Sequence, residues 1–123
     1  TEMIILSLGG SLIYPREIDV AYLKKFRELI LSSVTSGKKF GIVCGGGYPA
    51  REYIKKANEV LSLHSELNYM IGIAVTLVNA QLVHELFGDF AYPEVLRRYD
   101  KEIKTQKSLI IGGGWKPGCS TDH

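Results

Sequence analysis

The sequence predicts an α/β fold built on a mainly parallel sheet, and three observations support this prediction. Short apolar runs at residues 3–8, 40–44 and 108–111 each stop at a cluster of glycines, and each is too short for a helix. Amphipathic helical patterns lie between the runs, as expected for βαβ units. The 123 residues suit one domain with a modest core.

The first connection is expected to begin irregularly and to continue as a helix. Pro15 disfavours a regular element in residues 12–17. A helix is expected over residues 19–36, where Asp19 can cap the first turn and Gly37 can end the helix. Five apolar residues at helical spacing form the stripe expected to face the sheet: Val20, Leu23, Phe26, Ile30 and Val34.

The second connection is longer and is expected to hold two helices. The first extends from residue 48 to about residue 63, and the second follows a break at residues 62–65 and ends near Phe87. Residues 70–83 of the second helix are apolar on more than one face. This pattern favours either a subunit interface or burial between elements of one chain.

The stretch before the last apolar run carries turn signals and charge. Residues 91–93 include Pro93, which cannot serve in a central strand, so a turn or an edge segment is expected. Residues 96–106 are rich in charged side chains and are expected to form a solvated helix or loop.

The glycine clusters at residues 9–10, 45–47 and 112–114 together predict an anion site. In an open α/β sheet, ligands collect at the carboxyl ends of the strands, so loops on one edge would share one site. The helix after the second cluster would direct unpaired N–H groups at an anion, and Arg51 could add a charged fork. Chain reversal alone is the alternative explanation for any single loop.

Two phosphate-binding fingerprints match only in part. Residues 45–50 satisfy G-x-G-x-x-G/A after a strand, but the acidic residue expected about 20 positions on would be Glu66, in a helical stretch. Residues 113–120 would fit the P-loop pattern if Cys119 were lysine. A dinucleotide site and a P-loop are therefore both disfavoured.

Composition argues against several other functional classes. The net charge is +2 and no Lys/Arg run exceeds two residues, so no nucleic-acid partner is expected. The apolar segment at 70–83 is shorter than a bilayer span, so no membrane partner is expected. Two cysteines indicate reduced thiols in a cytoplasmic protein. No metal site is expected, because neither His64 nor His84 has spaced partners and the pair Cys119 and His123 lacks further ligands.

Four motifs in order resemble the amino acid kinase superfamily, and within it the archaeal type of uridylate (UMP) kinase. They are Leu-Ser-Leu-Gly-Gly-Ser at 6–11, the triple glycine followed by Ala-Arg-Glu-Tyr-Ile at 50–54, Ile-Gly-Ile at 71–73 with Asn-Ala at 79–80, and residues 113–122, which end in Pro-Gly-x-Ser-Thr-Asp. The resemblance implies a three-layer α/β/α sandwich. It also implies transfer of the γ-phosphoryl group of ATP to UMP, with ATP and Mg²⁺ as cofactors.

The resemblance also implies roles for individual residues. The phosphates of ATP would be held by Ser7, Gly9, Gly10 and Ser11. The acceptor phosphate and the transferring group would be bound by Gly46, Gly47 and Arg51. The acceptor nucleotide would be bound by Tyr69, Trp115, Lys116, Pro117, Gly118, Cys119, Ser120 and Thr121. Gly10, Ser11 and Arg51 are the expected catalytic residues, and Gly47 and Arg51 also face ATP. Three positions depart from the family pattern: Ser7 replaces a lysine, Tyr69 a ribose-binding aspartate and Leu77 an arginine.

The resemblance implies that residues 1–123 are the N-terminal, acceptor-side lobe of a longer kinase-like domain, and we expect such an extension because the chain stops where a helix should begin. The adenine pocket and a catalytic aspartate would then lie outside it. A homo-oligomer, either a dimer or a hexamer, is expected. The alternatives are another kinase of the superfamily, acting on isopentenyl phosphate, carbamate or an amino acid, and a nucleotide- or anion-binding module without catalysis.

Overall fold

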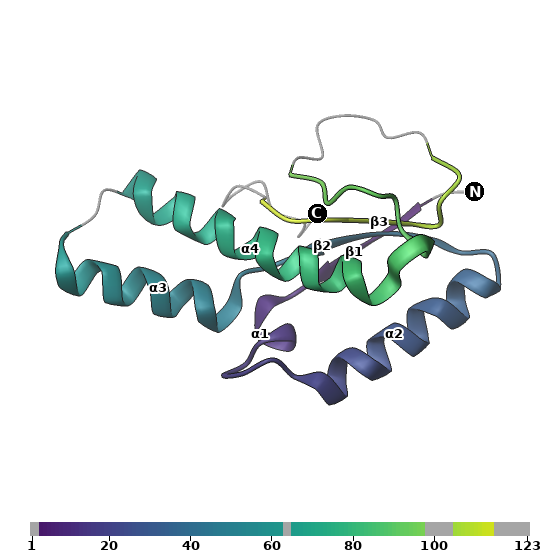
Figure 1. Cartoon of the computed structure of the whole chain (residues 1–123), viewed down its shortest axis with the longest axis horizontal. Helices are drawn as coiled ribbons and strands as arrows, with labels where there is room; N and C mark the ends of the chain where they lie inside the picture. Colours follow the sequence, from purple (N-terminus) through teal and green to yellow (C-terminus); the bar gives the residue numbers. More distant parts are fainter. Residues whose placement is uncertain (1–2, 63–64, 98–104, 115–123) are drawn as a thin grey trace.

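The computed structural model describes residues 3–62, 65–97 and 105–114, which form a small parallel sheet with helices packed against it (Figure 1). The elements in chain order are β1 (Met3–Leu8), α1 (Gly10–Ile13), α2 (Val20–Thr35), β2 (Lys39–Cys44), α3 (Gly47–Val60), α4 (Ser65–Phe87), the 3-10 turn η1 (Gly88–Phe90) and β3 (Leu109–Gly112). The expected α/β class with a parallel sheet is confirmed.

The strand order β1-β2-β3 explains where the helices lie. Ile4 pairs with Phe40 and Phe40 with Leu109, and all pairings are parallel. The connection from β1 to β2 and the connection from β2 to β3 run in the same direction across the sheet. When both connections are right-handed, their helices lie on the same face of the sheet. The described residues thus supply the sheet and one helical layer of the three-layer sandwich.

The core lies between the sheet and the two helices α2 and α4. One face of each strand contributes to it, because side chains alternate along a strand. The fully buried large side chains are Ile13, Ile42, Val83, Leu109 and Ile111. Each such side chain contributes on the order of 1.5 to 3 kcal/mol through burial, and Phe87 and Phe26 meet edge to face at the far end of α4.

Helix α2 follows the expected signals closely. Asp19 Oδ1 accepts the backbone N–H of Tyr22 at 2.9 Å, and Gly37 follows the helix with φ of +98°. Leu23 and Ile30 are buried as expected, but Val20 is 57% exposed. The prediction for Val20 was wrong because the first turn of α2 lies away from the sheet (Figure 1).

The prediction of an irregular segment after the first glycines was wrong in part. Residues 10–13 form the short helix α1, whose Ile13 is fully buried. The helix ends two residues before Pro15, because a proline disfavours helical backbone in the residue that precedes it.

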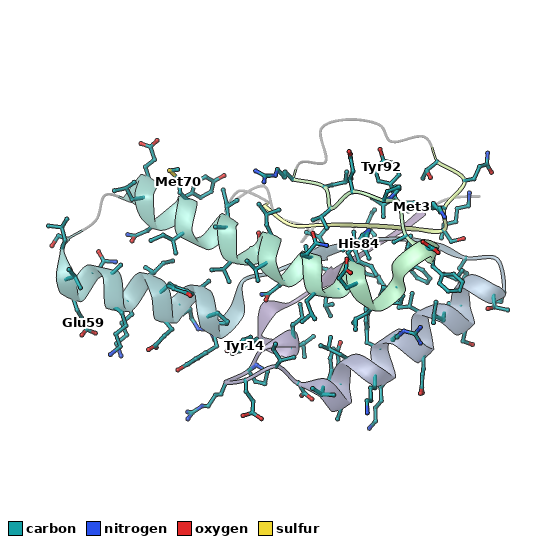
Figure 2. All side chains as sticks on the ribbon, in the orientation of Figure 1. Met3, Tyr14, Glu59, Met70, His84 and Tyr92 are labelled. Atoms are coloured by element: carbon teal, nitrogen blue, oxygen red, sulfur yellow. The ribbon has the colours of Figure 1, made fainter. Side chains whose placement is uncertain are left out.

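Helices α3 and α4 form an antiparallel pair that extends beyond the carboxyl end of the sheet (Figure 1). Helix α3 ends at Val60, somewhat earlier than expected. One face of α4 packs on the sheet through residues such as Ala80 and Val83, and the opposite face exposes Leu67, Met70 and Val78. Figure 2 shows Met70 at the start of α4, on the side of this helix turned away from α3. The two-sided apolar pattern in the sequence therefore divides into a buried face and an exposed face.

By length and composition alone, α4 could cross a membrane. Core helices of soluble proteins meet the same criteria, and α4 contributes Ala80, Val83 and Phe87 to the core. The expectation of no membrane partner stays a prediction.

The segment after η1 lies along the outer edge of β3, as the sequence predicted for residues 91–93. Ala91 bridges Leu109, and Leu96 bridges Gly112, both in parallel. His84 on α4 is buried, and its Nε2 lies 2.9 Å from the carbonyl oxygen of Tyr92. The histidine thus ties α4 to the edge segment, a structural role that the sequence did not indicate.

Cys44 ends β2 and is buried without a disulfide partner. Burial raises the pKa of its thiol to about 12, because the thiolate would lose its hydration. At pH 8, we expect Cys44 to react with iodoacetamide roughly a thousandfold more slowly in the folded protein than in denaturant, where the thiol has its ordinary pKa of about 8.5. Peptide mapping of the alkylated protein separates Cys44 from Cys119.

The same shift gives a pH dependence of folding. The unfolded thiol ionises from about pH 8.5 upward while the folded thiol stays protonated until about pH 12, so the stability contributed by this group is lost across that window. Rapid alkylation of folded Cys44 at pH 8 would contradict the assigned burial.

Candidate functional site

The first and second glycine loops touch through their backbones at the carboxyl end of the sheet. A Cβ added to Gly10 would collide with the backbone of Gly46 and Gly47, and one added to Gly47 would collide with the backbone of Gly10. Gly45 lies close as well, since its Cβ would be 2.9 Å from the nitrogen of Gly10. Glycine is needed at these positions for close approach, and at Gly47 also for its φ of +64°.

Helix α3 begins at this contact and presents an open N-terminus. Gly46 is its N-cap residue and provides no side-chain hydrogen bond, and no acidic side chain lies in the first turn. The N–H groups of Gly46, Gly47 and Tyr48 therefore have no acceptor within the helix and remain available to an anion, while Pro49 has no N–H group. The helix dipole favours negative charge at the same point.

Helix α4 supports the second loop through Asn79. This side chain is only 4% exposed, and its Nδ2 donates to the carbonyl oxygens of Gly45 and Gly46 at 2.8 and 3.1 Å. These two bonds satisfy carbonyls at the end of β2 and fix the backbone that leads into α3. An amide side chain in an otherwise apolar face is thus explained by the loop that it holds.

The start of the third loop lies against the same face of α4. The hydroxyl oxygen of Thr76 accepts the N–H of Gly114, and an added Cβ on Gly113 would lie 2.7 Å from the carbonyl oxygen of Thr76. On the other side, the N–H of Gly113 donates to the carbonyl oxygen of Leu96, with an N···O distance of 3.0 Å, and the carbonyl oxygen of Arg97 lies beside Gly114. The third loop therefore begins between α4 and the edge segment.

Within the described part of the chain, one buried polar atom on α4 has no partner. The hydroxyl of Tyr69 is buried and makes no hydrogen bond, which is costly for a hydroxyl group. Tyr69 precedes Thr76 by seven residues, or about two helical turns, so both project from the same side of α4. A buried donor left open on this side marks a place where a ligand could supply the missing partner.

The structure places the sequence-predicted residues unevenly around this edge. Gly9 has nothing within 4 Å of an added Cβ, so open space adjoins it. Ser7, Ser11 and Arg51 are exposed, on β1, α1 and α3 in turn. Among the described residues, no hydrogen bond or ion pair engages the Arg51 guanidinium. Seven residues expected to bind the acceptor lie outside the described residues: Trp115, Lys116, Pro117, Gly118, Cys119, Ser120 and Thr121.

The sequence analysis missed Thr76 and Asn79 as parts of this site. The resemblance included Asn79 in a motif without giving it a role, and Thr76 was assigned nothing. The two residues lie three positions apart and so share one helix face. Polar residues at this spacing on a buried face need partners, and that requirement was the signal that could have identified them.

The described residues offer no ready metal site. Across residues 3–62, 65–97 and 105–114, no group of three or more His, Cys, Asp or Glu side chains is placed to hold a metal ion. What these residues do offer is a set of backbone N–H groups and one free guanidinium, which suit phosphate or carboxylate groups.

Comparison with known proteins gives consistent relatives. The model of the amino acid kinase family matches residues 2–115. The uridylate kinase of Methanobrevibacter smithii is 37% identical over 123 residues, covering 97% of this chain and 52% of that protein. The uridylate kinase of Thermococcus kodakarensis is 34% identical over 122 residues, covering 97% and 53%.

A solved structure agrees with these sequences. The crystal structure of uridylate kinase from Archaeoglobus fulgidus matches with a TM-score of 0.80 and 32% identity, over 98% of this chain and 54% of that one. The chain thus spans about half the length of the relatives it matches. Because the family model covers most of the sequence and the fold agrees with that of a solved relative, this chain belongs to the amino acid kinase family.

Proposed function

We propose that this chain forms the acceptor-side part of a kinase that transfers the γ-phosphoryl group of ATP to UMP, giving UDP. The relatives named uridylate kinase support the choice of reaction. The observation that carries the proposal is the contact of the first two glycine loops in front of the open N-terminus of α3. A cytoplasmic role in pyrimidine nucleotide synthesis would follow from this activity.

The chemistry suits the groups at this edge. Phosphoryl transfer requires aligned oxygens in surroundings rich in N–H groups and positive charge, and it requires little covalent participation by the protein. The loop at Gly9 and Gly10 would take the phosphates of ATP, and the first turn of α3 with Arg51 would take the acceptor phosphate. Contact between the two loops would bring donor and acceptor together, which is the main requirement of the reaction.

ATP and Mg²⁺ fit this arrangement to different degrees. The glycine backbones at 9–10 and 45–47 suit phosphate groups because side chains are absent where a ligand would approach. Mg²⁺ supplies charge neutralisation in this reaction class and is commonly held by nucleotide phosphates with one or two carboxylates. Among the described residues, no group of three or more His, Cys, Asp or Glu side chains is placed to hold it, so the phosphates of the nucleotide would be its main ligands at this edge.

Two alternatives remain, and one experiment separates them from the proposal. Tyr69 stands where the family resemblance places an aspartate, which favours considering another acceptor, such as isopentenyl phosphate, carbamate or an amino acid. A binding module without catalysis is the second alternative. ADP formation by the intact protein should be measured with ATP and each acceptor in turn. We expect the largest kcat/KM with UMP; ADP formation with a different acceptor, or none with any, would overturn the proposal.

Arg51 provides a first prediction for this site. Arg51→Ala should weaken UMP binding to the intact protein by about 1.5 to 3 kcal/mol, the range for a hydrogen bond to a charged group. Lys55→Ala is the matched control, because it removes an exposed cation one turn further along α3. Calorimetric titration measures both, and equal affinities in the two variants would place the acceptor phosphate elsewhere.

The unpartnered hydroxyl of Tyr69 provides a second prediction. Tyr69→Phe should leave the free energy of unfolding unchanged or raise it, because the variant loses a buried group without a hydrogen bond. The same variant should bind UMP about three- to tenfold more weakly if the nucleotide supplies the missing partner.

Tyr53→Phe is the control for that experiment, since Tyr53 is 65% exposed on α3 and should affect neither measurement. Chemical denaturation gives the stability, and titration with UMP gives the affinity. A loss of stability in Tyr69→Phe with unchanged affinity would assign the hydroxyl a structural role.

We also propose that two copies of this chain associate through the exposed face of α4. Leu67, Met70 and Val78 are 42%, 57% and 68% exposed and recur at helical spacing on one face. Val60 and Leu61 at the end of α3 are further exposed apolar side chains, with exposures of 87% and 67%. A second copy presents the same surface, as a two-fold interface requires.

Val78→Glu tests this association better than a change at Ile73, because Ile73 lies against Gly114 and would disturb the third loop. We expect the variant to sediment as a smaller species than the wild-type protein, since a charge would be buried at the interface. Leu29→Glu, at an exposed apolar position on α2 away from the proposed interface, is the control for charge alone. A wild-type protein that sediments as a monomer would rule out the interface.

A further inference from the structure

Thr76 lies between two glycine loops and presents a different group of its side chain to each. Its hydroxyl oxygen accepts the N–H of Gly114 at the start of the third loop. Its methyl group faces the second loop, since an added Cβ on Gly46 would lie 3.7 Å from Thr76 Cγ2. Threonine is the residue type that carries both a methyl group and a hydroxyl group on its Cβ. Valine would keep the methyl group without the hydroxyl, and serine would keep the hydroxyl without the methyl group.

The orientation of this side chain is fixed. The Thr76 hydroxyl donates to the carbonyl oxygen of Ile73, three residues earlier in α4, at 2.6 Å. A threonine in a helix chooses between two rotamers, and a bond of this kind selects one of them. The hydroxyl therefore uses its proton within α4 and presents a lone pair to Gly114.

Asn79 completes the connection from one loop to the other. Its two bonds to the carbonyl oxygens of Gly45 and Gly46 join the second loop to α4, one turn away from Thr76. A displacement of the second loop would therefore strain the hydrogen bonds of Asn79 and change the packing around the methyl group of Thr76. Because both residues belong to α4, the same displacement would also alter the hydrogen bond between the Thr76 hydroxyl and the N–H of Gly114.

We propose that Thr76 is a positioning residue that couples the second glycine loop to the third. A ligand that orders the second loop would then also order the start of the third, so that the two loops respond together. The consequence for catalysis rests on the proposed function, in which the second loop takes the acceptor phosphate. The coupling itself is a property of the free protein.

Amide hydrogen exchange in the intact, unliganded protein tests the coupling directly. Gly114 reports on the third loop through its bond to Thr76, and Gly45 reports on the second through its bond to the carbonyl oxygen of Leu8. Asn79→Ala should speed exchange at both amides by about 3- to 10-fold, the effect of losing one hydrogen bond. In a Thr76→Val background, Asn79→Ala should speed exchange at Gly45 but cause no further change at Gly114.

A matched pair of variants separates positioning from packing. Thr76→Val keeps the methyl and the volume, whereas Thr76→Ser keeps the hydroxyl. We expect Thr76→Val to lower kcat/KM for UMP about tenfold with the KM for ATP within about twofold of wild type, and Thr76→Ser to recover most of that loss. The exchange rate at the Phe40 amide, which donates to Ser108 within the sheet, checks that each variant is folded.

The outcomes distinguish this inference from the proposed function. An unchanged Gly114 exchange rate in Thr76→Val, or an equal effect of Asn79→Ala on Gly114 in both backgrounds, would overturn the coupling. A wild-type protein that forms no ADP with UMP would count against the proposed function, while the exchange data would still decide the role of Thr76.

Discussion

The backbones of Gly10 and Gly47 lie so close that neither residue can carry a side chain, and the arrangement of the candidate site depends on this contact. It fixes the end of β1 against the start of α3, so α1 and α3 must leave the sheet side by side. A Cβ at either position would push the two loops apart and separate the groups that each presents. In a reaction that depends on alignment, a displacement of about an ångström is enough to lose much of the rate.

A second constraint comes from α4, which serves the core and the site with one face. Ala80, Val83 and Phe87 of this face are buried against the sheet, whereas Thr76 and Asn79, which precede them along the helix, hold glycine loops. The same helix therefore sets the distance between the core and the loops. Because the interior is close-packed, the loops take their positions from a rigid element and not from their own short sequences.

The sequence was sufficient to predict the strands and the helical connections, because each depends on local signals. The cap at Asp19, the turn at Gly37 and the apolar runs before the glycines all act within a few residues of one another. Val20 was assigned wrongly because periodicity shows which side of a helix is apolar but not how far the sheet extends beneath it. The same limit hid the division of α4 into a buried and an exposed face.

The candidate site could be predicted only as far as its glycines. Their clusters follow apolar runs, and the rule that parallel strands end on one edge brings them together without knowledge of tertiary contacts. Thr76, Asn79 and His84 act on residues 8 to 38 positions away, as in the bond from Asn79 to Gly45, which spans 34 residues. No local pattern encodes such pairings, although a polar side chain on a buried helix face signals that some partner exists.

The polar residues of α4 carry a cost that bears on their purpose. Apolar side chains at positions 76 and 79 would suit the surrounding helix, and an unsatisfied amide or hydroxyl there would lose about 1 to 3 kcal/mol. The structure avoids that loss by pairing both residues with loop backbone. The N–H groups of the Asn79 amide and the acceptor side of the Thr76 hydroxyl are therefore satisfied only when the loops are in place, whereas the hydroxyl proton is used within α4. The free energy of these buried groups thus favours one arrangement of the loops over others. A helix optimised for packing alone would be at least as stable but would leave the loops free to move. Polar residues on α4 thus favour ordered loops over maximal stability of the helix, as expected where a site requires fixed loop positions.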